Sequence, residues 1–242
     1  MNRILFEPEE IAADGTVAFG GVRAEHVVNV LHATPGKVLK TGVVGGRIGT
    51  GEVVQIGGGK VVCRCVHDEI APEPWIDLIL APPRPRAFKR LLPQLVQLGV
   101  GNIFLVGAAK VEKMFWGATI LKEEEYRPLM VDALMQCGTA TLPQLHQHRN
   151  FRKFLSALDT KHYPVRLLAH PAQRSPESGD FAKACNGARL LLAIGPEGGW
   201  TDSELEMFQA KGFDAISLDG RILKTDTATV AIMGALLMHL QQ

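Results

Sequence analysis

Residues 195–199, Gly-Pro-Glu-Gly-Gly, place a single carboxylate, Glu197, among residues that shape the backbone. They follow the apolar run 189–194, and Thr201 and Glu204 then have capping-box spacing, which predicts the start of a helix. Glycines let a ligand touch the main chain. In open α/β sheets, ligands bind at strand-to-helix loops of this kind. We therefore expect a ligand site here, and the alternative is a tight turn with no ligand.

The residue types of this loop favour a neutral or cationic nucleoside-like ligand. The chain has neither the glycine-lysine pattern of a P-loop nor the three-glycine pattern of a dinucleotide site. Glu197 would also repel phosphate. A second loop, residues 218–225, follows another apolar run. A long apolar helix comes after it, which Thr225 or Asp226 could cap, and its small residues are compatible with contact to another subunit.

The elements that must position these loops lie in the C-terminal part of the chain. Apolar runs typical of buried strands occur at 76–81, 103–107, 166–170, 189–194 and 215–218, and amphipathic helical stretches lie between most of them. This alternation predicts a mostly parallel sheet covered on both faces. Residues 1–71, rich in Gly and Val, are typical of a small β-barrel or sandwich, with one helical stretch at 20–33. We predict a boundary near Pro72 and Pro74.

Bulk composition limits the function classes. Hydrophobic residues make up 46% of the chain and the formal net charge is +1, so nucleic-acid binding requires a local basic patch. Arg84, Arg86, Lys89 and Arg90 form one such cluster. No apolar segment reaches the roughly 18 residues of a membrane span, and we expect a cytoplasmic protein. The spacings of the cysteines and of the pair His146 and His148 predict no metal site.

Several of these segments together resemble the RsmE family of bacterial 16S rRNA methyltransferases. The resemblance covers most of the chain and is most specific in the Gly-Pro-Glu-Gly-Gly loop and in residues 218–228. It implies an N-terminal PUA-like RNA-binding β-barrel over residues 1–71. It also implies a C-terminal SPOUT domain over residues 72–242, an α/β fold with a trefoil knot. Proteins of this class are typically homodimers, and their partner is the small ribosomal subunit.

The resemblance implies that S-adenosylmethionine is the cofactor and that three loops cradle it. They lie after the apolar runs ending near residues 169, 194 and 218. The implied cofactor-binding residues are Ala169, His170, Pro171, Ile194, Gly195, Pro196, Glu197, Gly198, Gly199, Leu218, Gly220, Ile222, Leu223, Thr225 and Thr227.

The implied reaction is methylation of uridine N3, which requires the imide to be deprotonated or its charge stabilised. Lys224 stands where the family has arginine, and it is our candidate for stabilising that charge or for holding an RNA phosphate. Asp226 and Glu197 are weaker candidates for assisting deprotonation, and a helix cap is an equal reading for Asp226. The candidate RNA contacts are Arg3, Arg23, Arg84, Arg86, Lys89 and Arg90.

Two other functions stay open from the sequence. Lys224 replaces an arginine of the family pattern and Gln97 a glutamate, and these changes favour a non-catalytic RNA-binding or assembly protein on the same fold. The cofactor-type loops favour an enzyme. A methyltransferase of the same superfamily that acts on another RNA position is the second alternative.

Overall fold

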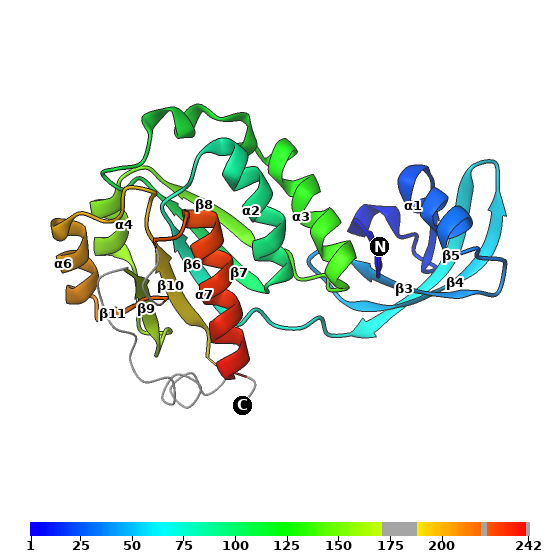
Figure 1. Ribbon diagram of the computed structural model, residues 1–242. Coiled ribbons are helices and arrows are strands. Elements are labelled where there is room, and N and C mark those ends of the chain that lie inside the picture. The colour runs from blue at the N-terminus through cyan, green and yellow to red at the C-terminus, as the bar shows by residue number, and fades with distance from the viewer. Residues whose placement is uncertain (171–187, 219–221, 241–242) are drawn as a thin grey trace. The chain divides into compact units, whose positions relative to one another are not determined.

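The computed structural model describes residues 1–170, 188–218 and 222–240, which form two compact units (Figure 1). The first unit is Met1–Glu73 with Pro128–Leu142, and the second is Pro74–Arg127 with Pro143–Gln242. Residues 128–142 therefore belong in space to the first unit, although they follow Pro74 in the sequence. No helix among the described residues is long and apolar enough to cross a membrane.

The first unit is built on one five-stranded mixed sheet. Its strands are β1 (Ile4–Phe6), β2 (Thr16–Phe19), β3 (Val38–Val43), β4 (Ile48–Gly57) and β5 (Lys60–Glu69). They lie in the order β1-β3-β4-β5-β2, and only the β1–β3 pair is parallel. A short 3-10 turn lies at Pro8–Glu10, and the predicted helical stretch forms α1 (Gly21–Glu25) and a π-helical turn (His26–Val30). Inward side chains such as Phe6, Phe19 and Val53 form its core.

The end of helix α3 (Glu123–Cys137) joins this sheet through main-chain hydrogen bonds. The amides of Asn2 and Arg3 both donate to the carbonyl of Met135, at 2.8 and 3.1 Å. The amide of Gly45 donates to the carbonyl of Ala140 at 2.7 Å. These bonds explain why residues 128–142 cluster with the N-terminal strands.

The second unit contains a six-stranded sheet in which every strand pair is parallel, as the alternating pattern predicts. The strands are β6 (Ile76–Leu80), β7 (Val100–Val106), β8 (Gln144–His148), β9 (Arg166–Ala169), β10 (Leu190–Ile194) and β11 (Asp214–Ile216). Their order is β11-β9-β10-β6-β7-β8. Five of them match the predicted strands. The edge strand β8 was not predicted, because Gln-Leu-His-Gln-His lacks the β-branched residues of a buried strand.

Helices cover both faces of this sheet, which is also as predicted. The helices are α2 (Pro85–Gln97), α4 (Phe151–Ala157), α6 (Asp202–Ala210) and α7 (Thr225–Leu240), with 3-10 turns at Lys113–Gly117 and Thr119–Leu121. One face packs against Phe151, Phe154 and Phe208 of α4 and α6. Helices α2 and α7 pack together, and they contact β7 and β10 respectively (Figure 1).

Candidate functional site

The described parts of three loops, at the carboxyl ends of β9, β10 and β11, line an open cavity of about 270 Å³. Parallel neighbouring strands end at the same edge of a sheet, so loops distant in sequence meet there. The lining is mostly apolar, with Ile194, Ile216 and Leu218 from the strand ends and Ala228 and Ile232 from α7. The glycine loop contributes residues 195–199, and the remaining lining residues are Ala169, His170, Trp200, Ser217, Ile222, Leu223 and Thr225.

The glycine loop is held in a tight turn whose backbone stays accessible. The amide of Gly199 donates to the carbonyl of Pro196 at 2.8 Å, and Gly199 has φ of 69°, a left-handed conformation that favours glycine. The ammonium of Lys110 donates to the carbonyl of Gly198 at 2.7 Å. A Cβ atom on Gly198 would lie only 2.9 Å from the Lys110 side chain. Lys110 therefore packs directly on this loop.

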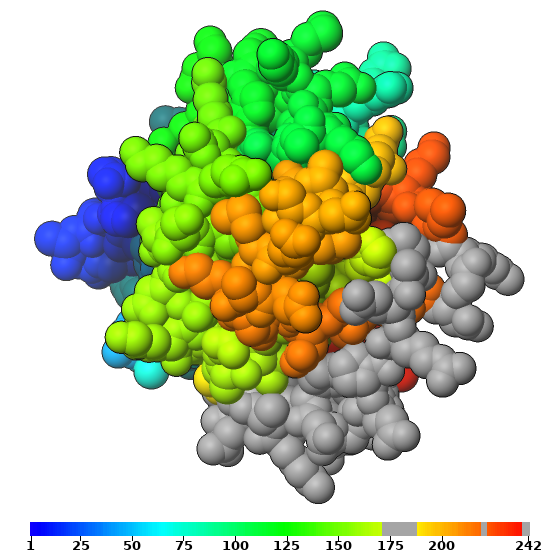
Figure 2. Space-filling model, turned by 90° about the vertical axis from the view of Figure 1, so that its left-hand side faces the viewer, coloured from blue at the N-terminus to red at the C-terminus, as the bar shows by residue number. Residues whose placement is uncertain are grey.

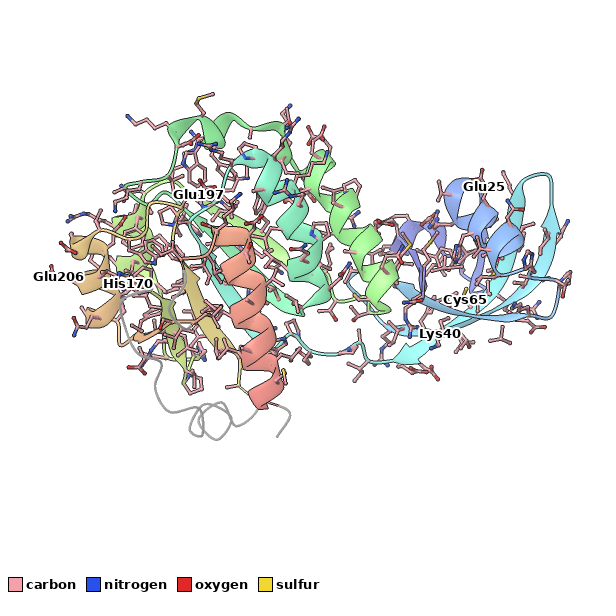
Figure 3. The ribbon with its side chains drawn as sticks, viewed as in Figure 1. Glu25, Lys40, Cys65, His170, Glu197 and Glu206 are labelled. Atoms are coloured by element: carbon pink, nitrogen blue, oxygen red, sulfur yellow. The ribbon has the colours of Figure 1, made fainter. Side chains whose placement is uncertain are left out.

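Thr225 ties the third loop to the glycine loop. It is buried, and its hydroxyl donates to the carbonyl of Gly195 at 3.2 Å. One turn further along α7, the Thr229 hydroxyl donates to the Thr225 carbonyl at 2.6 Å. At the end of β9, the amide of His170 donates to the carbonyl of Ile216 at 2.9 Å, which joins the ends of β9 and β11. Figure 3 labels His170 and Glu197, which follow the ends of β9 and β10.

Glu204 joins the start of α6 to the loop after β7. Only 6% of it is exposed. Its carboxylate accepts hydrogen bonds from the amide of Thr201 at 2.8 Å, the hydroxyl of Thr201 at 2.9 Å and the amide of Ala109 at 2.8 Å. The predicted capping box is therefore confirmed. Sequence spacing did not reveal the bond to Ala109, which holds the neighbour of Lys110 beside the glycine loop.

Trp200 was not singled out from the sequence, yet it forms part of the cavity wall. Its ring packs against Phe151 and Phe208, with ring centroids 5.6 and 4.9 Å away. Its indole Nε1 is buried and has no hydrogen-bond partner among the residues that the structure describes. A Cβ atom on Gly195 would lie 3.0 Å from this nitrogen, a close contact that favours glycine there. Buried donors are usually paired, so this nitrogen is an exception among the described residues.

Most of the predicted cofactor residues surround this one cavity. They are Ala169, His170, Ile194, Gly195, Pro196, Glu197, Gly198, Gly199, Leu218, Ile222, Leu223 and Thr225. Thr227 is exposed and does not line the cavity. Pro171 and Gly220 lie outside the described residues.

The three candidate catalytic residues occupy different positions around the cavity. Glu197 is exposed and lines it, whereas Lys224 is exposed and lies just before α7. In Asp226 one carboxylate oxygen accepts from the amide of Thr227 at 3.0 Å. Its other oxygen lies 3.5 Å from a guanidinium nitrogen of Arg90, on α2. Asp226 is thus engaged both at the start of α7 and with a residue of the predicted basic cluster.

The basic cluster lies before and within the first turns of α2. Arg86, Lys89 and Arg90 are exposed, and Arg84 forms an exposed ion pair of 3.2 Å with Glu112. Arg84 and Glu112 also border a small cavity of about 40 Å³ together with Glu197 and Lys110. Arg84 of the cluster therefore lies beside the glycine loop, although the two are about 110 residues apart in sequence.

Arg3 and Arg23, the other candidate RNA contacts, have their guanidinium groups engaged within the first unit. Arg3 is only 9% exposed and donates to the carbonyls of Thr41, Gly49 and Gly138 at 2.7 to 3.0 Å. Arg23 pairs with Glu10, donates to a main-chain carbonyl and lies over two phenylalanine rings. These contacts give both guanidinium groups partners within the first unit.

His146 and His148 lie on β8 and point to the face covered by α4, as their pairing with β7 shows. His146 Nε2 lies 3.1 Å from the Asn102 side-chain oxygen, and its ring stacks on Phe104. Burial and the neighbouring His146 lower the pKa of His148. Within the described residues, no group of three or more His, Cys, Asp or Glu side chains is arranged to hold a metal ion.

The fold and site define an α/β protein with a ligand-type cavity at the carboxyl ends of a parallel sheet. Its fold matches that of a ribosomal RNA small subunit methyltransferase E from Neisseria gonorrhoeae, solved with S-adenosylmethionine. The TM-score is 0.76 at 22% identity, and the match covers 98% of this chain and 97% of the other. A methyltransferase from Legionella pneumophila, also solved with this cofactor, has a TM-score of 0.74 at 22% identity and covers 98% and 97%.

The chain belongs to the RNA methyltransferase domain family, whose model matches residues 71–237. It is also similar over nearly its whole length to curated relatives. It is 29% identical to ribosomal RNA small subunit methyltransferase E of Treponema pallidum, over 99% of this chain and 91% of that protein. The protein of the same name from Synechocystis is 26% identical over 95% and 75%.

Proposed function

We propose that this protein transfers a methyl group from S-adenosylmethionine to N3 of a specific uridine in 16S rRNA. The observation that carries the proposal is the apolar cavity formed by three loops at the carboxyl ends of β9, β10 and β11. The similarity to ribosomal RNA small subunit methyltransferase E over almost the full chain supports the choice of substrate.

The residues of the cavity fit S-adenosylmethionine. Ile194, Ile216 and Leu218 provide apolar surface for an adenine ring, and main-chain groups of residues 195–199 are suited to hydrogen-bond its polar edge. Glu197, on the cavity wall, favours a ligand with a positive charge. When bound, the cofactor supplies an electrophilic methyl group on a sulfonium cation.

The chemistry left to the protein concerns the uracil imide. N3–H is a weak acid, so its deprotonation must be assisted or its developing negative charge stabilised. Lys224, exposed beside the cavity, is the proposed stabiliser of that charge. Glu197 and Asp226 are proposed to accept the N3 proton. Because N3 lies on the pairing edge, the target base must be unpaired or flipped out of a helix.

The proposal extends to the architecture and assembly of the protein. The curled five-stranded sheet of the first unit is proposed to act as a PUA-like RNA-binding barrel. The second unit is proposed to be a SPOUT domain with a trefoil knot, working as a homodimer in the cytoplasm. Arg84, Arg86, Lys89 and Arg90 are proposed to contact RNA phosphates, because they are clustered beside the glycine loop. Arg3 and Arg23 of the first unit remain proposed RNA contacts, with Arg23 the more exposed of the two.

The test is methyl transfer from labelled S-adenosylmethionine to small ribosomal subunits that lack uridine N3 methylation. Subunits that already carry the modification are the matched control. Reverse-transcription stops locate the product, since N3 methylation blocks base pairing. We expect label at one uridine of 16S rRNA and none in the control.

Two other results would each replace the proposal. Label at another position or another atom would indicate a methyltransferase with a different target. Calorimetric binding of the cofactor without any transfer would favour a non-catalytic RNA-binding protein, which the replacement of arginine by Lys224 makes a specific alternative.

A further inference from the structure

A second cavity, of about 570 Å³, lies between the edge strand β8 and helix α4. It borders the same sheet as the cofactor-type cavity but lies at the opposite edge, since β8 and β11 are the outermost strands. Its wall includes His146, His148, Arg149 and Lys153. The proposed methyl transfer uses none of these residues.

Flat rings form the floor of this cavity. Phe104 and His146 are stacked, with ring centroids 5.0 Å apart and an interplanar angle of 22°. His148 and Phe154 lie 4.5 Å apart at 35°. A sheet face covered by a helix normally carries aliphatic residues. On β8, however, this face presents two half-buried imidazoles. Partly exposed aromatic faces of this kind are suited to stack unpaired nucleobases.

The cavity and its surroundings carry an excess of positive charge. Arg149 and Lys153 border it, and Arg152 borders an adjoining cavity of about 320 Å³. All three are exposed. The only acidic residue on the wall of the first cavity, within the described part of the chain, is Asp159. Its carboxylate already accepts the amide of Lys161. The carboxylate of the adjoining cavity, Glu204, is buried and hydrogen-bonded.

These cavities lead toward the proposed active site. The two basic cavities share Arg149 and Asn150. The second of them reaches Ala109, whose neighbour Lys110 lines the small cavity beside Glu197. Glu197 in turn lines the cofactor-type cavity. Figure 2 faces this part of the surface, with residues 145–165 in yellow-green beside α6 in orange and residues 107–120 in green.

We propose that a single-stranded segment of the RNA substrate, adjacent to the target uridine, follows this row of cavities. One unpaired base stacks in the cavity on the partly exposed ring of His148, which Phe154 supports from the core, while Arg149, Arg152 and Lys153 neutralise its phosphates. The inference deepens the proposed function and rests on it for the identity of the substrate. It adds a positioning site on β8 and α4 for RNA beyond the reacting nucleotide.

The test measures the affinity of the full-length protein, saturated with S-adenosylmethionine, for a fluorescent oligouridylate of about twelve nucleotides. Removing the ring in His148→Ala should weaken binding about tenfold, whereas His148→Phe, which keeps an aromatic face, should stay near wild type. Arg152→Gln with Lys153→Gln should also weaken binding, about tenfold at low salt. Lys122→Gln, an exposed charge of the same unit outside the four cavities, is the matched control.

The outcomes separate this inference from the proposed function. Weaker oligonucleotide binding and a raised KM for ribosomal subunits, with kcat unchanged, would support the RNA site. Equal affinity of all variants for the oligonucleotide would overturn it, even if the wild type transfers methyl groups. Weakened binding of subunits alone would also overturn it, because the cavity would then bind a ribosomal protein. The variants could also bind the oligonucleotide more weakly although the wild-type protein transfers no methyl group. That result would support the RNA site and refute the proposed reaction.

Discussion

The two ends of the parallel sheet differ in whether their buried polar groups have hydrogen-bond partners. At the amino ends, Asp77 is 1% exposed and fully engaged. It accepts from the amide and side chain of Asn102, from the hydroxyl of Tyr163 and from Arg189. At the carboxyl ends, a cavity opens between the loops, and the indole nitrogen of Trp200 has no partner among the described residues.

This difference separates polar groups that hold the fold from those available to a ligand. A closed network satisfies every member, so it stabilises the sheet and leaves nothing for substrate. It also has a titration signature, since burial and the bond to Asp77 raise the pKa of Tyr163 well above its usual range. In an open site, polar groups without partners lower the stability of the fold, and the glycine backbone stays accessible to a ligand. The comparison therefore predicts that changes at one end alter stability and changes at the other alter function.

The largest effect is expected from Asp77→Ala. The change leaves the Tyr163 hydroxyl, the Asn102 amide and Arg189 without their buried acceptor. We expect a loss of about 3–5 kcal/mol in the free energy of unfolding, measured by urea denaturation. The affinity of the folded fraction for S-adenosylmethionine should stay unchanged. A matching loss of affinity would show that the two ends of the sheet are coupled. It would refute the prediction that changes at the amino ends alter stability alone.

Lys224→Ala should produce the converse result at the carboxyl end. Removing the proposed stabiliser of the imide charge should slow single-turnover methyl transfer about a hundredfold. Because Lys224 is exposed, the free energy of unfolding and the affinity for S-adenosylmethionine should both be unchanged. Lys224→Arg, which restores the residue type of the family pattern, is the control and should transfer at least as fast as wild type. Unchanged transfer by the alanine variant would exclude this role.

Trp200→Phe tests whether the unpartnered indole nitrogen serves a ligand. The phenyl ring keeps contact with Phe151 and Phe208, while the buried donor is removed. We expect S-adenosylmethionine to bind about tenfold more weakly by calorimetry, the value of one hydrogen bond in a buried site. Phe208→Leu, which disturbs the same aromatic cluster without touching the donor, is the control. Equal losses of affinity in both variants would indicate that packing, not the donor, matters.

The sequence predicted much of this architecture because local patterns determine it. Five parallel strands, the helices between them and the Thr201–Glu204 capping box follow from periodicity and spacing. The loops at residues 195–199 and 218–225 were recognised from their glycines and polar residues, and the structure brings described parts of both to one cavity.

Other features depend on contacts between residues far apart in the chain. The carbonyl of Met135 accepts from Asn2 and Arg3, so residues 128–142 join the first unit. No local pattern reveals that Glu204 binds the amide of Ala109 or that Lys110 packs on Gly198. The contacts of Arg3 are of the same kind. Its guanidinium donates to three main-chain carbonyls, and no sequence pattern predicts these hydrogen bonds.

The smallest effect is expected from changing Arg84, Arg86 and Arg90 together to Gln. These exposed side chains contribute little to stability, because surface ion pairs such as Arg84–Glu112 are worth about 0–1 kcal/mol. For every phosphate that a removed arginine neutralises, the logarithmic salt dependence of RNA binding should become flatter by about 0.7, the value for single strands. Titration of the oligouridylate at several salt concentrations measures this slope. An unchanged slope would make the cluster a solvated surface and would limit the functional region to the cavities.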